Sequence, residues 1–420
     1  MRALMLTPDV GHLDRRIAQE ATTLAGRGWT VDIWATVDPD LAYDDDLPAG
    51  VRLIGTSRSP LPEGRRRGVL RWARRALARV VPPLGRVVEV WQYRRRRLEA
   101  DIAEANLPDI LRLDPFDLVV AHDVPMMPLG ARLKEAWNAR LISDLHEMYA
   151  EQDEYFTTQT ARRYWRGLEG AGLAVSDGII CVNAAVARYV VANYAPSAPM
   201  VTITNAVPFQ LPSTPGPSIR QIYAIPEEAR VLVFAGSLRP NKNLEALIEG
   251  FKRARLDGWV LAILGEGPLR EQLEATIRRQ GQERTVFVGQ RAGQRDLIHV
   301  ASTADVGILP YQALGLNYQL ATPNKLFEYI QARLPIATSK LPEIERIVAP
   351  LGTAGFVDYS GADSTARGLV DFIRDVLPTI TGARLEAAAA AVSWEREEPV
   401  LLDLVSRATG AVEPREDPPT

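Results

Sequence analysis

The chain has 420 residues, more than one hydrophobic core normally supports, so its length predicts two domains. Its composition, with 46% hydrophobic and 24% charged residues, is that of an ordinary globular protein, and no stretch approaches the roughly 18 apolar residues of a membrane-spanning helix. The net charge of −3 averages strongly uneven segments and excludes no class of partner, whereas the single cysteine, Cys181, excludes a disulfide framework.

The first half of the chain alternates predicted strands and helices, which is the pattern of a parallel sheet covered by helices. The first strand is expected at residues 3–6. Because Pro8 and Asp9 follow it directly, the N-terminus does not fit a secretory signal, and we expect a cytoplasmic protein. A helix is predicted over residues 15–26, and further strands at residues 31–35, 118–121, 139–143, 178–182 and 200–204.

A proline-rich stretch separates this half from a second alternating series. We therefore expect a first domain at residues 1–206, a linker at 207–228 and a second domain at 229–392. In the second domain, strands are predicted at 231–235, 259–264, 286–288 and 306–309, and helices at 243–253, 269–280 and 296–301. The Pro- and charge-rich tail at 411–420 is expected to be flexible.

The most informative segment covers residues 322–339. It predicts a helix that Thr322 caps and that has Pro323 at its first position, followed by a buried strand. The free N–H groups at such a helix start form an anion site, for which phosphate is the usual ligand. Glu328 follows within two turns, where a carboxylate can accept from both hydroxyls of a ribose. The alternative is an ordinary helix–strand unit without a ligand.

The same segment, Pro323-Asn324-Lys325-Leu326-Phe327-Glu328-Tyr329, resembles the signature of the family 4 glycosyltransferases, in the bacterial branch with Pro-x-Lys-Leu-Phe-Glu-Tyr. The resemblance implies an α/β protein of the GT-B fold, with two facing Rossmann-like domains and a deep inter-domain cleft. It also implies that a C-terminal helix at about residues 393–410 crosses back to the first domain. Donor-binding roles are implied for Asn324, Lys325, Leu326 and Glu328, although a solvated Lys325 is the competing interpretation.

Two earlier turns resemble donor-binding turns of this family. In one, Lys242 matches the lysine that is implied to hold the donor diphosphate, but Ser237 replaces the usual arginine. Arg239 is the candidate substitute, and a solvated arginine is the alternative. In the other turn, Gly265 and Gly267 match the Gly-x-Gly-Pro motif, for which a tight turn between a strand and a helix is the alternative interpretation.

One carboxylate of the family is missing. Many members have a Glu-x7-Glu pair in which the first glutamate contacts the donor sugar and the second, here Glu328, contacts the ribose. The first position is Leu320. Asn317, Tyr318 and Gln319 are candidates for the sugar contact, and the sequence does not identify the donor sugar.

Two predicted strands of the first half end beside a histidine and an acidic residue, at His122-Asp123 and His146-Glu147. The carboxyl ends of parallel strands are where α/β proteins place their chemistry. Both pairs resemble the Ala-His-Asp and Asp-x-His-Glu segments of the family, which implies that these four residues face the sugar and the acceptor. Gly11 and the residues after it resemble the loop that closes against the donor diphosphate.

Residues 58–97 contain thirteen Arg, no Lys and two Glu. An apolar stripe that includes Trp72 runs through this basic segment at helical spacing. Such a helix can lie on an anionic membrane surface, so we expect peripheral contact with the inner face of the plasma membrane as one possibility. Packing of the stripe on its own domain is the alternative. Nucleic acid is not expected as a partner because the segment matches no binding module.

The resemblance implies a retaining glycosyltransferase that moves a sugar from a nucleotide-diphosphate donor to the hydroxyl of a saccharide or lipid-linked acceptor. We expect a role in cell-surface polysaccharide or glycoconjugate biosynthesis. No cofactor and no metal are expected, because the resemblance implies that helix N-termini, Lys242 and Arg239 neutralise the leaving group. The acidic run at residues 44–46 resembles a metal motif but is interpreted as solvated surface. A nucleotide-sugar epimerase of the same architecture and a non-catalytic nucleotide-sugar-binding protein are the alternatives.

Overall fold

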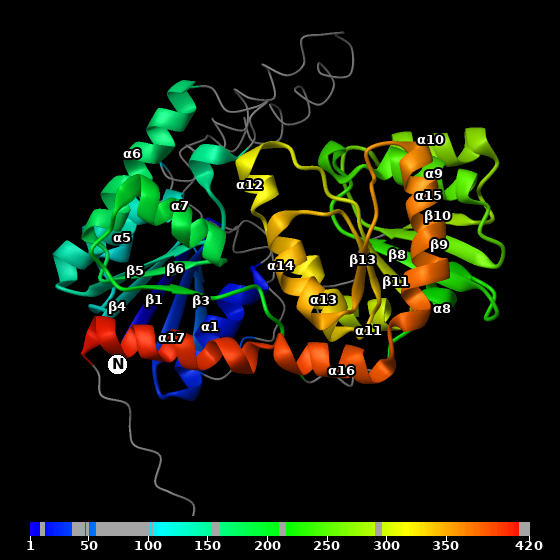
Figure 1. Ribbon diagram of the computed structural model, residues 1–420. Coiled ribbons are helices and arrows are strands. Elements are labelled where there is room, and N and C mark those ends of the chain that lie inside the picture. The colour runs from blue at the N-terminus through cyan, green and yellow to red at the C-terminus, as the bar shows by residue number, and fades with distance from the viewer. Residues whose placement is uncertain are drawn as a thin grey trace, which may run out of the picture. The chain divides into compact units, whose positions relative to one another are not determined.

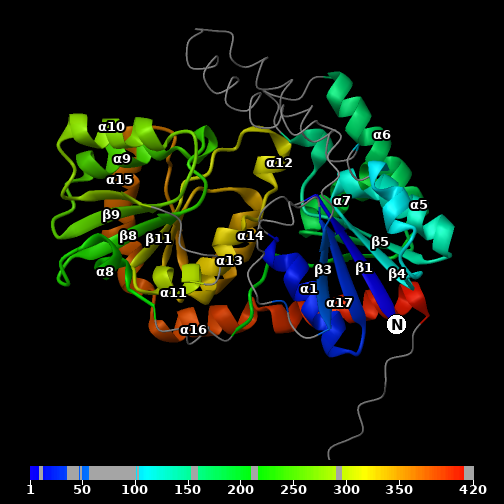
Figure 2. The ribbon, with the colours of Figure 1, turned by 180° about the vertical axis from the view of Figure 1, so that it is seen from behind.

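The computed structural model describes residues 1–8, 13–35, 47, 50–55, 101, 104–152, 159–209, 216–289 and 296–410. The chain divides into two compact units. The first contains Met1–Thr204 together with the chain from Glu398 onward, and the second contains Asn205–Glu397. Each unit is a parallel sheet with helices on both faces (Figures 1 and 2). Gly11, the Arg-rich segment 58–97, the acidic run 44–46 and the tail 411–420 lie outside the described residues.

The first unit has a seven-stranded sheet in the order β3-β2-β1-β4-β5-β6-β7. Its strands are β1 Arg2–Thr7, β2 Thr30–Ala35, β3 Val51–Gly55, β4 Leu118–His122, β5 Arg140–Leu145, β6 Gly178–Cys181 and β7 Met200–Thr202. Its helices before the return of the chain are α1 Arg15–Gly26, α4 Leu107–Ile110, α5 Met127–Trp137, α6 Gln159–Val175 and α7 Ala184–Tyr194. Because both faces of the sheet are covered, its central strands are almost continuous apolar runs.

The start of α1 shows how the sequence specifies this unit. Asp14 has extended backbone dihedrals, and its carboxylate accepts a hydrogen bond from the Arg16 N–H at 2.9 Å, which is an N-cap. Ile17, Ala21 and Leu24 then form a buried stripe at helical spacing. The helix therefore begins at Arg15, and it packs against β2 and β3.

The second unit has a six-stranded sheet in the order β10-β9-β8-β11-β12-β13. Its strands are β8 Arg230–Ala235, β9 Trp259–Leu264, β10 Val286–Gly289, β11 Val306–Leu309, β12 Ile336–Thr338 and β13 Ala354–Phe356. Its helices are α8 Ile219–Tyr223, α9 Leu244–Ala254, α10 Arg270–Gln280, α11 Asp296–Ser302, α12 Gly315–Gln319, α13 Asn324–Gln331, α14 Pro342–Leu351, α15 Ala362–Asp371 and α16 Gly382–Ala391.

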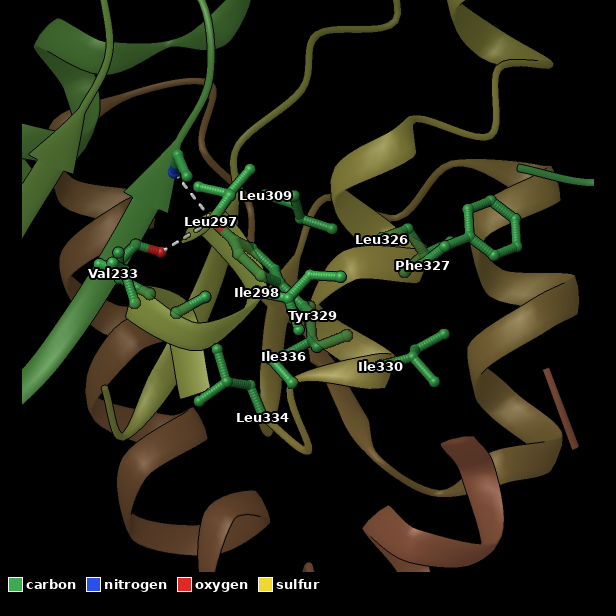
Figure 3. Packing of buried hydrophobic residues seen from close by; sticks show 14 of the residues in the cluster. Val233, Leu297, Ile298, Leu309, Leu326, Phe327, Tyr329, Ile330, Leu334 and Ile336 are labelled. Atoms are coloured by element: carbon green, nitrogen blue, oxygen red, sulfur yellow. Dashed lines mark hydrogen bonds between the residues drawn. The ribbon is translucent and has the colours of Figure 1, made fainter. Parts of the chain in front are cut away.

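Tyr329 on α13 fixes that helix to the sheet of the second unit (Figure 3). Its ring is fully buried, and its hydroxyl accepts from the Ala235 N–H at 2.8 Å and donates to the Val233 carbonyl at 3.2 Å. Gly307 on β11 leaves the space that the ring fills, since a Cβ there would overlap it. The buried hydroxyl therefore both donates and accepts a hydrogen bond, and these bonds fix α13 relative to the sheet.

The expected linker at residues 207–228 falls within the second unit. Ser218 and Gln221 form a capping box at the start of α8, and Ile219 and Ile225 are buried in the core of the unit. Burial of these two apolar side chains favours packing over a free linker. Residues 210–215 lie outside the described part of the chain.

The last helix, α17 Trp394–Thr409, begins in the second unit and ends in the first. The Trp394 N–H donates to the Val207 carbonyl at 3.0 Å. Further along, Leu404 packs beside Gly178 of β6, where a Cβ would come within 3.1 Å of it. None of the helices within the described ranges has the length and apolar character that a bilayer crossing requires.

Candidate functional site

The carboxyl ends of β4 and β5 bring four polar residues of the first unit together. The Asp123 N–H donates to the Asp144 carbonyl at 2.8 Å, and the His146 N–H donates to the Asp123 carboxylate at 3.1 Å. Asp123 has a φ of 65°, a left-handed conformation that a non-glycine residue adopts rarely. The backbone thus turns sharply after His122, and the ends of the two strands are tied to each other.

Asp144 is the centre of this cluster. Its Oδ2 lies 3.0 Å from His122 Nδ1 and 2.8 Å from His146 Nε2, and these two nitrogens are 3.3 Å apart. Its Oδ1 accepts a hydrogen bond from the Arg16 guanidinium. His122 and Asp144 are buried, and His146 keeps 14% of its side chain exposed. One carboxylate therefore joins both histidines, which were expected from the sequence, to an arginine of α1.

Arg16 and Glu20 lie on the buried face of α1, inside the range predicted as a helix, although neither was predicted to belong to a site. Arg16 Nε donates to Glu20 Oε1 at 3.1 Å, and the two side chains are 2% and 0% exposed. They are spaced i, i+4, the separation at which side chains meet on a helix. The signal in the sequence was that both positions fall on the same stripe as Ile17, Ala21 and Leu24, where charged residues are unusual.

The charges of the cluster shift pKa values in opposite directions. Burial would raise the pKa of Asp144, but Arg16 and His146 hold the pKa of that carboxyl well below its usual range. Burial also opposes the charge of His146, yet the Asp144 carboxylate raises the pKa of His146 to about 10, so the ring is an imidazolium at neutral pH. Burial, followed by repulsion from Asp144, raises the pKa of Glu20 to about 7.

Within the described residues, His122, Asp144 and His146 are the group that could hold a metal ion, since one ligand atom of each lies within 4.8 Å of the others. Two imidazoles and a carboxylate are a common ligand set for zinc or iron. The Arg16 guanidinium on the same carboxylate opposes a divalent cation, and three donors already satisfy Asp144. We therefore interpret the group as a hydrogen-bonded network.

Glu147 does not share the burial of this network. Its side chain is exposed and accepts a hydrogen bond from the Gln152 amide. Of the four residues expected to face the sugar and acceptor, the structure brings His122, Asp123 and His146 together. Asp144 was named only as part of a motif, and the structure shows that it organises the cluster.

In the second unit, Gly265 and Gly267 allow two turns to pack on each other. A Cβ at Gly265 would overlap the Gly236 carbonyl oxygen, and one at Gly267 would overlap that of Leu238. The Leu238 N–H donates to the Glu266 carbonyl at 3.0 Å across the same contact. The tight-turn interpretation of this motif is therefore sufficient to explain both glycines.

The turn after β8 carries the expected cations. Ser237 and Arg239 are exposed, whereas Lys242 is half-buried with its Nζ 3.6 Å from the centroid of the Tyr311 ring. After burial, the Glu328 carboxylate is the next cause that raises the pKa of Tyr311, so Glu328 also lies near that ring. Tyr311 thus marks the place where the turn after β8, the loop after β11 and helix α13 meet.

The start of α13 differs from the prediction by one position. The helix begins at Asn324, and Pro323, with φ −67° and ψ 143°, is the N-cap, so Thr322 lies one position before the cap. Proline reaches this extended conformation without strain because its ring fixes φ. Asn324 is half-buried, and Leu326 is fully buried in the core.

Glu328 is 3% exposed, and its carboxylate forms an ion pair with Lys325 Nζ at 2.6 Å. The two residues are spaced i, i+3 on α13. Lys325 is therefore not the solvated lysine of the alternative interpretation. The preceding helix α12 carries Asn317, which is buried, and Leu320, the position of the missing glutamate, follows directly as its C-cap.

Comparisons with known proteins agree with this fold. Residues 13–206 match the family model of the glycosyl transferase 4-like domain, and residues 217–389 match that of the glycosyl transferases group 1. Among curated proteins, no match was found.

Solved structures share the fold of the whole chain at low identity. Sucrose-phosphate synthase from Thermosynechococcus elongatus is 16% identical, with a TM-score of 0.72 over 98% of this chain and 100% of that one. HepE of Anabaena, solved with UDP and glucose, is 14% identical, with a TM-score of 0.68 over 97% of this chain and 99% of that one. WaaG, a glycosyltransferase involved in lipopolysaccharide biosynthesis, is 17% identical, with a TM-score of 0.64 over 98% and 100%. With both domain types matched and this fold throughout, the chain is a GT-B glycosyltransferase of the family 4-like group.

Proposed function

We propose that the protein transfers a sugar, with retention of configuration, from a nucleoside-diphosphate donor to an acceptor hydroxyl, in the synthesis of a cell-surface polysaccharide or glycoconjugate. The observation that carries this proposal is the convergence of Lys242 and the Lys325–Glu328 pair around Tyr311 in the second unit. HepE, which shares the fold, has been solved with UDP and with UDP-glucose, and this supports a uridine nucleotide as the donor.

In this proposal the second unit binds the donor. Lys242 and the start of α13 neutralise the diphosphate, and this charge neutralisation takes the place of a metal ion. Glu328 accepts hydrogen bonds from the ribose hydroxyls, and its ion pair with Lys325 orients the glutamate. Arg239 is exposed on the same turn as Lys242 and supplies a further cation when the donor is present.

The cluster of the first unit contacts the sugar and the acceptor. His146 carries a positive charge at neutral pH because of Asp144, which favours a departing anionic diphosphate. His122 is the residue of the cluster that orients a substrate hydroxyl. No proton transfer through a free base is required for this role, because the leaving phosphate oxygen can accept the proton of the acceptor hydroxyl.

The test is nucleotide release from a panel of donors, UDP-glucose, UDP-galactose and GDP-mannose, with and without an added lipid-linked or saccharide acceptor. We expect acceptor-dependent release that falls by about 100-fold in Lys242→Ala and Glu328→Gln, since each loses an interaction with the donor. Lys252→Ala is the matched control, because Lys252 is an exposed lysine on α9.

Three outcomes would contradict the proposal. Unchanged turnover in both variants would remove the assigned donor site. Conversion of the donor to another sugar nucleotide without an acceptor would favour an epimerase, and tight nucleotide binding without turnover would favour a binding protein.

A lipid-linked acceptor is the finer part of the proposal, and it rests on the Arg-rich sequence 58–97, which lies outside the described residues. Each basic residue near an anionic surface contributes about 1 kcal/mol. Co-sedimentation with phosphatidylglycerol vesicles is therefore expected to fall when Arg71, Arg74 and Arg75 are changed to Glu. Equal sedimentation of the wild type and this variant would refute membrane contact.

A further inference from the structure

Around Asp144, three buried polar atoms have no hydrogen-bond partner within the described part of the chain: Arg16 Nη1, Glu20 Oε2 and His122 Nε2. Their side chains are 2%, 0% and 1% exposed. Buried polar atoms in proteins are nearly always paired, so each such atom requires an explanation. All three belong to the network around Asp144, and of the three, His122 Nε2 is on a residue expected to meet substrate.

The other nitrogen of His122 is already engaged. His122 Nδ1 lies 3.0 Å from Asp144 Oδ2, and a carboxylate can only accept, so this nitrogen carries the proton. In a neutral imidazole the proton then cannot also be on Nε2, whose lone pair is left to accept a hydrogen bond. A hydroxyl group of a substrate is a donor of the required kind.

The orientation of Asp144 decides which nitrogen of His122 is protonated. Oδ1 is held by Arg16, which leaves Oδ2 for the two histidines. Arg16 in turn is fixed by its hydrogen bond to Glu20 one turn further along α1. A planar guanidinium can bond two carboxylates at once, whereas a lysine ammonium provides a single point charge without this fixed geometry.

We propose that Arg16 and Asp144 are positioning residues that fix His122 with its proton on Nδ1, so that the buried Nε2 is left as the acceptor for a hydroxyl of the bound sugar or acceptor. The proposal rests on the proposed function for the identity of the ligand. The state of the His122 ring itself does not depend on turnover.

The first test is therefore spectroscopic. Long-range 1H–15N spectra of protein with 15N-labelled histidine distinguish protonated from unprotonated ring nitrogens, and the spectrum of His122→Gln identifies the His122 signals among the four histidines. We expect a single form with the proton on Nδ1 in the wild type and a mixture of both tautomers in Arg16→Met. Arg27→Met, the same substitution at an exposed arginine after α1, should match the wild type.

Arg16→Lys retains the positive charge and serves as the variant that is expected to fold if Arg16→Met does not. It should give a spectrum between those of the wild type and the mixture. A His122 ring that keeps its proton on Nδ1 alone in Arg16→Met, or in Arg16→Lys if only that variant folds, would overturn the proposal even if transferase activity is confirmed.

The second test is kinetic and uses UDP-glucose as the probe donor. Misplacing His122 should lower kcat by about 100-fold in Arg16→Met while KM for the donor changes much less, because the nucleotide and diphosphate of the donor are assigned to the second unit. Arg16→Lys should recover part of kcat. A rise in KM with kcat unchanged, or equal kcat in Arg16→Met and Arg27→Met, would contradict positioning. If the wild type itself releases no nucleotide from any donor of the panel, the proposed function fails, and the tautomer measurement still decides the role of Arg16.

Discussion

Asp144→Asn is the substitution that should change the electrostatics of the first unit most. In the wild type the carboxylate raises the pKa of His146 from its usual 6.5 to about 10 against the opposing effect of burial. At 1.36 kcal/mol per pKa unit, this corresponds to a preference of about 5 kcal/mol for the imidazolium. An asparagine has the same shape but no charge, so burial should dominate, and we expect the pKa of His146 to fall to about 6.5 or lower.

The same change alters the pH dependence of stability. The folded pKa of His146 lies above its unfolded value, so the imidazolium stabilises the native state fully below pH 6.5, and this contribution is lost as the pH rises through about 10. The free energy of unfolding of the wild type should therefore decline by up to about 5 kcal/mol between these pH values relative to Asp144→Asn.

The measurement is a 1H–13C titration of the histidine Cε1 signals from pH 5 to 11, with urea unfolding at matched pH values. His299, which hydrogen-bonds to the Gly216 carbonyl in the second unit at 2.9 Å, is the internal control and should titrate identically in both proteins. The reasoning is refuted if His146 of the wild type titrates near pH 6.5, or if His146 of the variant still titrates near pH 10.

Three further substitutions test the packing and the buried charge. Tyr329→Phe removes the phenol oxygen that accepts from a buried backbone N–H. The free energy of unfolding, measured in urea, should therefore fall by about 1–3 kcal/mol. An unchanged free energy of unfolding would contradict the hydrogen bonds described. Gly267→Ala should lower the free energy of unfolding by about 1–3 kcal/mol or more, because the new Cβ overlaps the Leu238 carbonyl. Gly167→Ala, at a helical glycine with open space around it, should be neutral or stabilising. Equal effects of the two substitutions would refute the packing argument. Glu20→Gln should remove a pH-dependent loss of stability, because the folded pKa of Glu20, about 7, lies above the usual 4.5. The free energy of unfolding of the wild type should therefore fall by about 3 kcal/mol relative to this variant as the pH rises from 4.5 to 7. Parallel curves of unfolding free energy against pH would show that Glu20 is not buried as described.

The apolar pattern predicted part of the regular structure, whereas helices such as α5, α6 and α7 were not predicted. Strands β9 and β11 and helix α1 have the predicted bounds, because buried parallel strands and amphipathic helices have distinct hydrophobic periods. Strand β3 was missed. It is a short edge strand, Val51–Gly55, with the charged Arg52 as its second residue, so its apolar run is too weak to stand out.

The candidate site was predicted only in part. His122 and His146 were found because they follow predicted strands, where parallel sheets place their chemistry. Arg16 and Glu20 were not recognised as members of that cluster, because charged residues are expected at the surface and only the tertiary contact with Asp144 shows otherwise. In the same way, the sequence could not show that Gly265 and Gly267 are explained by contact between two turns.

The most direct test of the donor site is hydrogen–deuterium exchange of the full chain with and without saturating UDP. Binding at the assigned place should protect backbone amides in residues 236–243 and 323–331, which carry Lys242 and Glu328, and should leave α8 unchanged. Protection confined to other segments, with none in these two, would contradict the account.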